Sequence, residues 1–323
     1  MRLVLCFLVL AASLPGSTVS VNVTPQIVAA GDINNAMYGQ TAGAVFSGVA
    51  RLTLTRSDGT FLCTGSVVGS GSILTAGHCV TNASGAPITS LVTAILTDGL
   101  GNSLSVSTSS IVVHPTWNGS LGTTTDLAVL NFGSLFPNWV SVYQLYNTAD
   151  EVGQTFTVAG FGMTGSFGAA ATGGAGTFHQ GQNKWEARNN QLGIGWTNDG
   201  LVMDFDNGLA ANDAFGQFYG LSNLGLGNFE VNTAPGDSGG PSFLAGKVAG
   251  VTSFGFTLSG GVQPDCVVAT PNAPNSSCGE FSSMVRVSSN INWIQGAMVP
   301  EPATYLTAAC ALLALGWSRR RRQ

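Results

Sequence analysis

Residues 63–80 read CTGSVVGSGSILTAGHCV, a run of β-branched and small residues that ends at His78. Two other stretches also place a chemically reactive residue type beside an apolar run. In TTTDLAVLNF, residues 123–132, that residue is Asp126, and in NTAPGDSGGPSF it is Ser238. Short apolar runs bounded by turn-forming residues are typical of β-strands. The three stretches therefore predict a histidine, an aspartate and a serine near strand ends.

These three residue types, taken together, indicate nucleophilic catalysis. A serine hydroxyl is a poor nucleophile unless a neighbouring base takes its proton. A histidine can be that base when a buried carboxylate holds its ring in the required tautomer. Ser238 is flanked by Gly236, Gly239 and Gly240, and glycines allow a tight turn whose N–H groups point at a developing oxyanion.

In the order His, Asp, Ser, the motifs LTAGHC and GDSGGP closely resemble those of the chymotrypsin-like (trypsin-superfamily) serine peptidases. The resemblance implies that His78 is the general base and acid, that Asp126 orients it and that Ser238 attacks the substrate. It also implies that the N–H groups of Gly236 and Ser238 form the oxyanion hole. The implied fold is all-β: two six-stranded antiparallel Greek-key barrels with the active site between them, followed by a short C-terminal helix.

The resemblance continues between the motifs, over roughly residues 37–295. VAGFG is similar to a strand of the family, and NINWIQ is similar to its closing helix. In VTSFG, the family implies that Ser253 hydrogen-bonds the catalytic aspartate and that Gly255 pairs with the substrate backbone. IVVHPTW matches a framework strand, so His114 is interpreted as structural and not as a second base.

The N-terminal part of the domain departs from the family pattern. The family's activation sequence IVGG is replaced by AMYGQ, which begins at Ala36. Asp237, which in the family receives the new α-amino group, is present. Cleavage near Ala36 or Met37 would create such a group, which makes residues 21–36 a candidate pro-segment. The alternative is that signal removal suffices and that residues 21–36 pack on the surface.

The family's pocket positions indicate the substrate preference. Asn232 lies six residues before Ser238, where trypsin-type members carry an aspartate that binds Lys or Arg. Gly255 and Gly279 align with glycines that keep the pocket walls open. A neutral floor in an open pocket predicts cleavage after a neutral side chain, apolar or aromatic, with modest selectivity.

Composition agrees with an all-β protein that has many turns. Charged residues make up 8% of the 323 residues and glycine contributes 44, whereas an ordinary soluble domain is roughly 25% charged. Away from both ends, 6 basic residues face 15 acidic ones. Such a surface repels a phosphate backbone, which argues against a nucleic-acid partner.

Both ends of the chain carry targeting patterns. Residues 1–20 have the layout of a secretory signal peptide: one basic residue, an apolar core and small residues. At the other end, VPEP, an uncharged run over residues 303–317 and four arginines make up a tail over residues 299–323 that resembles the PEP-CTERM sorting signal of Gram-negative bacteria. The resemblance implies a temporary inner-membrane anchor, removed by an exosortase on the way to the cell surface or the extracellular matrix. The alternative is a short anchor that stays.

Four cysteines remain when Cys6 in the signal peptide and Cys310 in the tail are set aside. Three pairings are open. The local one, Cys63 with Cys79 and Cys266 with Cys278, is the most economical. The rival is a metal site, but the paired CxxC spacing of zinc sites is missing.

No cofactor or metal is expected from the sequence. The segment DFDNGLAANDAFG, which begins at Asp204, is similar to a calcium loop in its first positions. Its glycine is one position early for an EF-hand, and Phe215 occupies the acidic twelfth position. The segment is therefore interpreted as a polar loop. His179, alone in a glycine-rich insertion, is interpreted as solvated.

The sequence predicts a peptidase domain over residues 37–298, with barrel one over about 37–147 and barrel two over about 148–298. Its function is predicted as hydrolysis of peptide bonds in protein or peptide substrates through an acyl-enzyme intermediate. The alternative is a surface or extracellular-matrix binding module that keeps the peptidase fold without activity. An inactivated relative would typically have lost a triad residue or an oxyanion glycine, and all of them are present.

Overall fold

A computed structural model describes residues 27–39, 45–121, 125–166, 171, 173–258, 260–267 and 274–298. The predicted signal peptide and the predicted PEP-CTERM-like tail, with its apolar run over residues 303–317, lie outside the described residues. Within the described residues, no helix is both long enough and apolar enough to cross a bilayer.

The first β unit is a closed barrel of six antiparallel strands. Its order around the barrel is β2-β3-β4-β7-β6-β5, with the bounds β2 Val49–Arg56, β3 Gly59–Gly69, β4 Ser72–Thr75, β5 Thr89–Thr97, β6 Ser103–Val113 and β7 Ala128–Phe132. Strand β2 shows why these residues form a barrel wall. Leu52 and Leu54 are fully buried, whereas Thr53 and Thr55 between and after them face outward, as the two-residue period of a strand requires.

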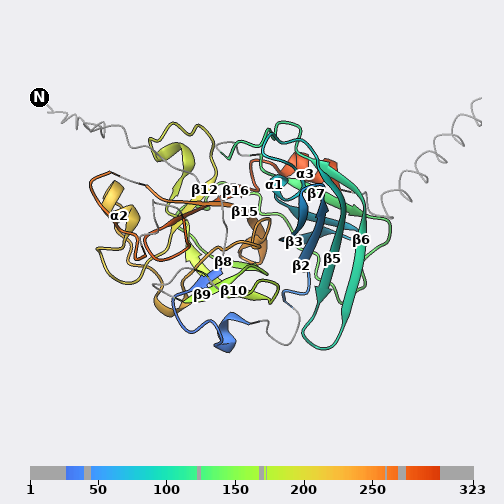
Figure 1. Ribbon diagram of the computed structural model, residues 1–323, viewed down its shortest axis with the longest axis horizontal. Coiled ribbons are helices and arrows are strands. Elements are labelled where there is room, and N and C mark those ends of the chain that lie inside the picture. The colour runs from blue at the N-terminus through green and yellow to red at the C-terminus, as the bar shows by residue number, and fades with distance from the viewer. Residues whose placement is uncertain are drawn as a thin grey trace, which may run out of the picture.

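The second β unit is a curled seven-stranded sheet, a half-barrel beside the first barrel (Figure 1). Its order is β10-β8-β14-β15-β16-β12-β11, with the bounds β8 Thr155–Gly160, β10 His179–Lys184, β11 Ala187–Arg188, β12 Leu201–Asp204, β14 Pro241–Leu244, β15 Lys247–Phe256 and β16 Phe281–Arg286. The expected all-β fold with two β units is confirmed. The second unit differs in detail because β13 (Val231–Asn232) pairs in a separate small sheet.

That small sheet has three strands in the order β13-β1-β9. Strand β1 (Ile27–Ala29) is its centre and comes from the candidate pro-segment; it runs antiparallel to β13 and parallel to β9 (Thr164–Ser166). Val28 and Ala29 are completely buried. Strand β1 of the candidate pro-segment is therefore built into the fold, whereas Asp32, Asn34, Asn35 and Ala36 are exposed.

Helices are few and short among the described residues. They are α1 (Gly77–Val80), α2 (Ala214–Tyr219) and α3 (Ile291–Ala297). Three 3-10 helices span Ala36–Tyr38, Asn189–Gln191 and Gly227–Phe229. The expected C-terminal helix is α3, and it lies against barrel one (Figure 1). Asn131 on β7 donates from its side chain to the Ala297 carbonyl at 3.0 Å. His114 packs its ring 4.5 Å from that of Trp293, in keeping with a structural role.

Candidate active site

His78 and Asp126 form the best-defined pair at the site. His78 lies in α1, directly after β4, and Asp126 lies just before β7. The Nδ1 atom of His78 is 2.7 Å from Asp126 Oδ2, and the backbone N–H of His78 donates to Asp126 Oδ1 at 2.7 Å. Asp126 is completely buried, whereas 23% of the His78 side chain is exposed. The carboxylate thus fixes both the ring and the backbone of a histidine whose edge remains open to a substrate.

Ser253 on β15 adds a third contact to this carboxylate. Its hydroxyl donates to Asp126 Oδ2 at 2.5 Å, so one oxygen of Asp126 receives bonds from both units of the fold. An ionised carboxylate can only accept hydrogen bonds. With the carboxylate ionised and the ring neutral, the proton between them lies on Nδ1, and Nε2 of His78 carries the lone pair.

A disulfide joins the histidine segment to the neighbouring strand. Cys79, next to His78, is bonded to Cys63 on β3, with 6.4 Å between the Cα atoms. The second disulfide joins Cys266 to Cys278, with a Cα separation of 5.3 Å. Both pairs predicted from local spacing are confirmed, and these sulfur atoms are not available as metal ligands.

Ser238 lies in a tight turn between β13 and β14. Gly236 and Gly239 have φ values of +101° and +80°, a region that other residues rarely adopt. A Cβ atom on Gly239 would also come within 2.0 Å of Thr75 Oγ1. The turn is closed by hydrogen bonds from the N–H of Asp237 to the Ala234 carbonyl and from that of Gly240 to the Asp237 carbonyl. Glycine is therefore required on both sides of the serine.

The backbone of this turn is bonded to residues next to the histidine and aspartate pair. The Ser238 carbonyl accepts a 2.8 Å hydrogen bond from Thr64 N–H on β3, and it lies 3.7 Å from Cys79 Sγ. The next N–H, that of Gly239, donates to the carbonyl of Thr252 at 2.8 Å. The serine is thus held beside the neighbour of His78 on one side and the neighbour of Ser253 on the other.

The predicted oxyanion donors remain unoccupied within the part of the chain that the structure describes. Neither the N–H of Gly236 nor that of Ser238 donates to another described residue. By contrast, the N–H groups of Asp237, Gly239 and Gly240 are all engaged. Two free N–H groups flanking one residue in a glycine turn can stabilise a negatively charged oxygen.

The Asp237 side chain holds this turn through hydrogen bonds to two backbone N–H groups. Its Oδ1 accepts from Gly162 N–H and its Oδ2 accepts from Ala234 N–H, both at 2.8 Å. The side chain is fully buried, and this burial raises the pKa of its carboxyl well above the usual range. Among the described residues it has no ion-pair partner.

Thr64 is a site residue that the sequence analysis missed. Besides its N–H bond to Ser238, its hydroxyl donates to the Gly236 carbonyl at 2.8 Å and accepts from Phe161 N–H at 3.0 Å. It therefore connects barrel one, the serine turn and the end of β8. Its position directly after Cys63 in the first motif is the only local signal that could have revealed it.

Two of the predicted pocket residues, Asn232 on β13 and Gly255 on β15, are linked through Ser282 on β16. The Oδ1 of Asn232, which is buried, accepts from Ser282 Oγ at 2.7 Å and from Thr233 N–H at 2.9 Å. Ser282 is in turn the register partner of Gly255. A Cβ atom on Gly255 would meet its nearest neighbour, the Phe281 carbonyl oxygen, at 3.5 Å. The Gly255 wall therefore has ordinary space, as an open pocket needs.

Gly279 has a different structural reason to be glycine. Its φ is +85°, and a Cβ atom there would come within 2.2 Å of the Pro264 carbonyl oxygen. The residue thus permits a close approach of two backbone segments at the Cys266–Cys278 loop. Asn232 contacts this loop through a long hydrogen bond from its Nδ2 to the Ser276 carbonyl, at 3.4 Å.

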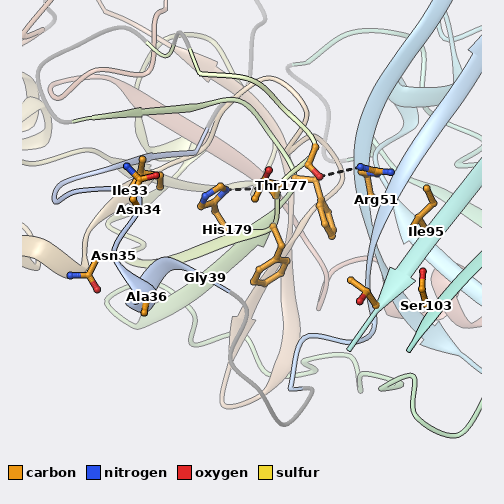
Figure 2. Close-up of a pocket in the computed structure, with 14 residues that line it drawn as sticks. Ile33, Asn34, Asn35, Ala36, Gly39, Arg51, Ile95, Ser103, Thr177 and His179 are labelled. Atoms are coloured by element: carbon orange, nitrogen blue, oxygen red, sulfur yellow. Dashed lines mark hydrogen bonds between the residues drawn. The ribbon is translucent and has the colours of Figure 1, made fainter. Parts of the chain in front are cut away.

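A separate cavity of about 670 Å³ lies away from these residues (Figure 2). Arg51 lines one side of it and the segment that carries Asn34 and Asn35 lines the other, with His179 between them. His179 is half-buried and not simply solvated as expected, and this burial lowers its pKa. None of His78, Asp126 and Ser238 lines this cavity.

Comparison with known proteins agrees with the geometry. The sequence profile of the trypsin family matches residues 40–212, a range that contains His78 and Asp126 and ends before Ser238. Among solved structures, HL collagenase is similar with 20% identity and a TM-score of 0.54, over 80% of this chain and 96% of that one. Neuropsin, a serine protease of mouse brain, has 17% identity and a TM-score of 0.54, over 80% of this chain and 97% of that one.

A search of curated proteins gave no significant match. The two structural likenesses establish the fold, and the profile match covers more than half of the chain. The chain belongs to the trypsin family and is a serine endopeptidase.

Proposed function

We propose that this endopeptidase works through a catalytic triad of His78, Asp126 and Ser238. The observation that carries the proposal is the 2.7 Å contact between His78 Nδ1 and Asp126 Oδ2. It leaves Nε2 of His78 as the base for the Ser238 hydroxyl. The backbone contacts of the serine turn with Thr64 and Thr252 support the same assignment.

The chemistry follows from these positions. Ser238 Oγ attacks the carbonyl carbon of the scissile peptide bond while its proton moves to His78 Nε2. The N–H groups of Gly236 and Ser238 stabilise the oxyanion of the tetrahedral intermediate. His78 then gives its proton to the leaving amine, and an acyl-enzyme ester remains on Ser238. Water attacks this ester with His78 as base and releases the carboxylic acid product.

The pocket favours a neutral side chain before the scissile bond. The carboxamide of Asn232 supplies hydrogen-bonding atoms without a charge, and the space at Gly255 admits a large group. Apolar contacts discriminate by only about 1–3 kcal/mol per missing methylene. Selectivity is therefore broad, with apolar or aromatic side chains preferred.

The mature enzyme keeps strand β1. Val28 is the register partner of Asn232, so removing residues up to Ala36 would take away the strand that pairs with the pocket floor. Asp237 already accepts two backbone N–H groups. Both observations favour signal removal alone over a second cleavage near Met37. N-terminal sequencing of active protein tests this, since an active chain that begins at residue 36 or 37 would contradict it.

We further propose export through the signal peptide and sorting through the PEP-CTERM-like tail, with transient membrane anchoring and removal by an exosortase. The two disulfides fit an oxidising compartment outside the cytoplasm. Intact-mass analysis of the protein from its native host is the test. Loss of residues 299–323 is expected, and a full-length C-terminus on the surface protein would indicate a retained anchor.

A fluorophosphonate probe tests the triad directly. The purified protein should be labelled once, at Ser238, and should hydrolyse casein. Ser238→Ala should abolish labelling and lower hydrolysis by several orders of magnitude, because the triad acts as a unit. Ser242→Ala is the matched control, since Ser242 is also buried and lies four residues away; it should keep both properties. Absence of labelling in a folded wild-type protein would instead favour the binding-module alternative.

A further inference from the structure

A second group of reactive side chains lies in the second β unit, outside the candidate triad. It consists of Glu186, just before β11, Asp204, at the end of β12, and Asp206, two residues later. One carboxylate oxygen from each of the three lies within 4.8 Å of the other two. Calcium binds oxygen ligands at about 2.3–2.6 Å, so oxygens around one such ion are at most about 5 Å apart. The spacing of these three side chains is that of ligands around a single ion.

The inner carboxylates, those of Asp204 and Asp206, have one hydrogen-bond donor between them among the described residues, the N–H of Phe215, which donates to Asp204 Oδ2 at 2.8 Å. Asp204 is completely buried and Asp206 is 3% exposed. One oxygen of Asp204, Oδ1, and both carboxylate oxygens of Asp206 have no hydrogen-bond partner. Buried carboxylates without donors are strongly unfavourable. The unpaired oxygens are an observation separate from the clustering of the carboxylates, and they point to a bound cation.

The surrounding side chains are satisfied, in contrast to these inner oxygens. Asp213 accepts from Gly216 N–H and from Ser222 Oγ, and Glu230 accepts from the N–H groups of Asp206 and Leu226. The protein's own donors are thus used by the outer carboxylates.

The loop before β13 closes and orients the cluster. Asn223 donates from its side chain to Glu186 Oε1 at 2.5 Å, which fixes the direction of that carboxylate. Gly225 has a φ of +83°, and a Cβ atom there would come within 2.3 Å of Glu230 Oε2 and 2.7 Å of Asp206 Cβ. The backbone therefore lies directly against the acidic group, and a larger residue at this position would displace it.

We propose that Glu186, Asp204 and Asp206 form a calcium-binding site that secures the β11–β12 hairpin to the loop leading into β13. The donors are all carboxylate oxygens, the ligand type that calcium prefers, whereas zinc prefers nitrogen and sulfur. Because β13 carries Asn232, the ion would also stabilise the pocket side of the enzyme. The EF-hand comparison could not reveal the site, since Glu186 lies 18 residues before Asp204 in the chain.

The rival explanation is that the carboxyl groups share protons. Burial and the neighbouring acidic groups raise the pKa of Asp206 to about 10. Burial also raises the pKa of Glu186, against the opposing charge of Lys184. A protonated cluster and a calcium site give the same arrangement of side chains. They differ in their response to added calcium, which is what the experiment measures.

Equilibrium dialysis with radioactive calcium tests the proposal on the full chain in a Ser238→Ala background, which prevents autolysis. After removal of metal with EGTA, the protein should bind about one ion per chain, with a Kd of about 10⁻⁴–10⁻³ M as in extracellular modules. Asp206→Asn and Glu186→Gln should each weaken binding at least tenfold. Asp58→Asn, which removes an exposed carboxylate from the first barrel, should bind as the parent does.

Thermal unfolding of the parent protein gives a second readout, which does not depend on whether the variants fold. Calcium at 100 times Kd should raise the Tm of the parent by about 5 °C or more, and an equal ionic strength of NaCl should not. In EGTA, Asp206→Asn should be at least as stable as the parent because it removes a source of repulsion. The proposal is overturned if the parent binds no calcium, or if binding persists undiminished in both variants.

Discussion

The two β units bury acidic side chains to very different extents. Among the described residues, barrel one buries Asp98 and Asp126, whereas the second unit and its flanking loops bury Glu151, Asp204, Asp206, Asp213, Glu230, Asp237, Asp265 and Glu280. Barrel one is a closed sheet whose inner face is apolar, so its hydrophobic core suffices to hold it. The second sheet is open, and several of its loops are fixed by carboxylates that accept backbone N–H groups, as those of Asp213, Glu230 and Glu280 do.

The difference teaches that the same residue type has separate tasks in the two units. In barrel one, Asp126 is the residue proposed to orient the catalytic base. In the second unit, carboxylates such as Glu151 and Glu280 anchor loops and strands. Substitution of Asp126 should therefore lower activity, and substitution of the carboxylates that anchor the second unit should lower stability.

The largest expected effect is that of Asp126→Asn on activity. The amide oxygen of the asparagine can still accept from the backbone N–H of His78. Its NH₂ group, however, replaces the charged oxygen that accepts from Nδ1, so the ring adopts the wrong tautomer. We expect kcat/KM to fall by about 10⁴-fold, with little change in the denaturant midpoint.

Asp98→Asn is the matched control for this prediction. Asp98 is also buried in barrel one, where it accepts from the N–H groups of Leu100 and Asn102. Its substitution should leave kcat/KM unchanged. If Asp126→Asn unfolds the protein instead of inactivating it, the proposed division between the two units is wrong.

The next effect, on stability, comes from Glu151→Ala. Glu151 is completely buried and accepts from Nε and Nη2 of Arg286 at 3.0 and 2.7 Å, and from Ser288 Oγ. Removing it leaves Arg286 with only Asp199 as an ion-pair partner. Breaking a buried pair from one side costs about 3–5 kcal/mol, and Asp199 places this case near the lower end. Urea denaturation of the Ser238→Ala protein measures the loss.

An exposed ion pair provides the comparison for Glu151. Asp58 pairs with Arg56 at 2.8 Å on the surface of barrel one. Because exposed pairs contribute little, Asp58→Ala should leave the denaturation midpoint unchanged. Equal effects of the two substitutions would show that Glu151 stabilises the protein no more than an exposed carboxylate does.

The sequence predicted features that depend on residues close together in the chain, and it missed contacts between residues far apart. The strands of barrel one follow from alternation, as in RLTLTR, and the disulfides follow from short spacing between cysteines. His78, Asp126 and Ser238 could be proposed because each lies in a recognisable local motif.

The contacts that the sequence did not reveal join residues far apart in the chain. Glu151 and Arg286 are 135 residues apart, and Thr64 reaches Gly236 across 172 residues. Strand β1 is only three residues long, too short for a periodic signal. Such partners are brought together by the packing of two units and leave no pattern in either segment.

The pH dependence of stability should reflect the second unit. Burial raises the pKa of Glu280 from 4.5 to about 8, and burial raises that of its neighbour Asp265 as well. The folded state then binds a proton more tightly than the unfolded state. The free energy of unfolding is therefore highest below about pH 4.5 and falls, by about 1–3 kcal/mol for this group, as the pH rises to 8.

Glu280→Gln should flatten this slope between pH 5 and pH 8, even if its stability at one pH is lower. Urea denaturation at several pH values measures the slope. Asp58→Asn is the control, because the hydrogen bond from Arg56 lowers the pKa of that exposed carboxyl and its titration lies below this window. A slope that Glu280→Gln leaves intact would assign the pH dependence to other groups.

The smallest effect is that of Asn232→Asp on specificity, and it tests directly whether Asn232 forms the pocket floor. Ser282 Oγ and Thr233 N–H both donate to Asn232 Oδ1, so an aspartate keeps these bonds and adds a negative charge at the proposed floor. Hydrogen bonds to charged groups contribute about 1.5–3 kcal/mol, which corresponds to about 10–100-fold. Ser276 accepts from Asn232 Nδ2 and donates its N–H to the buried carboxyl of Glu280, so repulsion by Glu280 favours the lower figure.

We therefore expect cleavage after Arg and Lys to increase about tenfold relative to cleavage after Phe and Leu, as measured by mass spectrometry of a digested peptide library. The gain should be larger at pH 8 than at pH 6, because the new carboxyl must ionise in a buried site. Asn189→Asp is the matched control, since Asn189 is also buried and bonds Ser283 on the same strand as Ser282. A change of preference in the control, or none in Asn232→Asp at either pH, would place the pocket floor elsewhere and leave the triad assignment untouched.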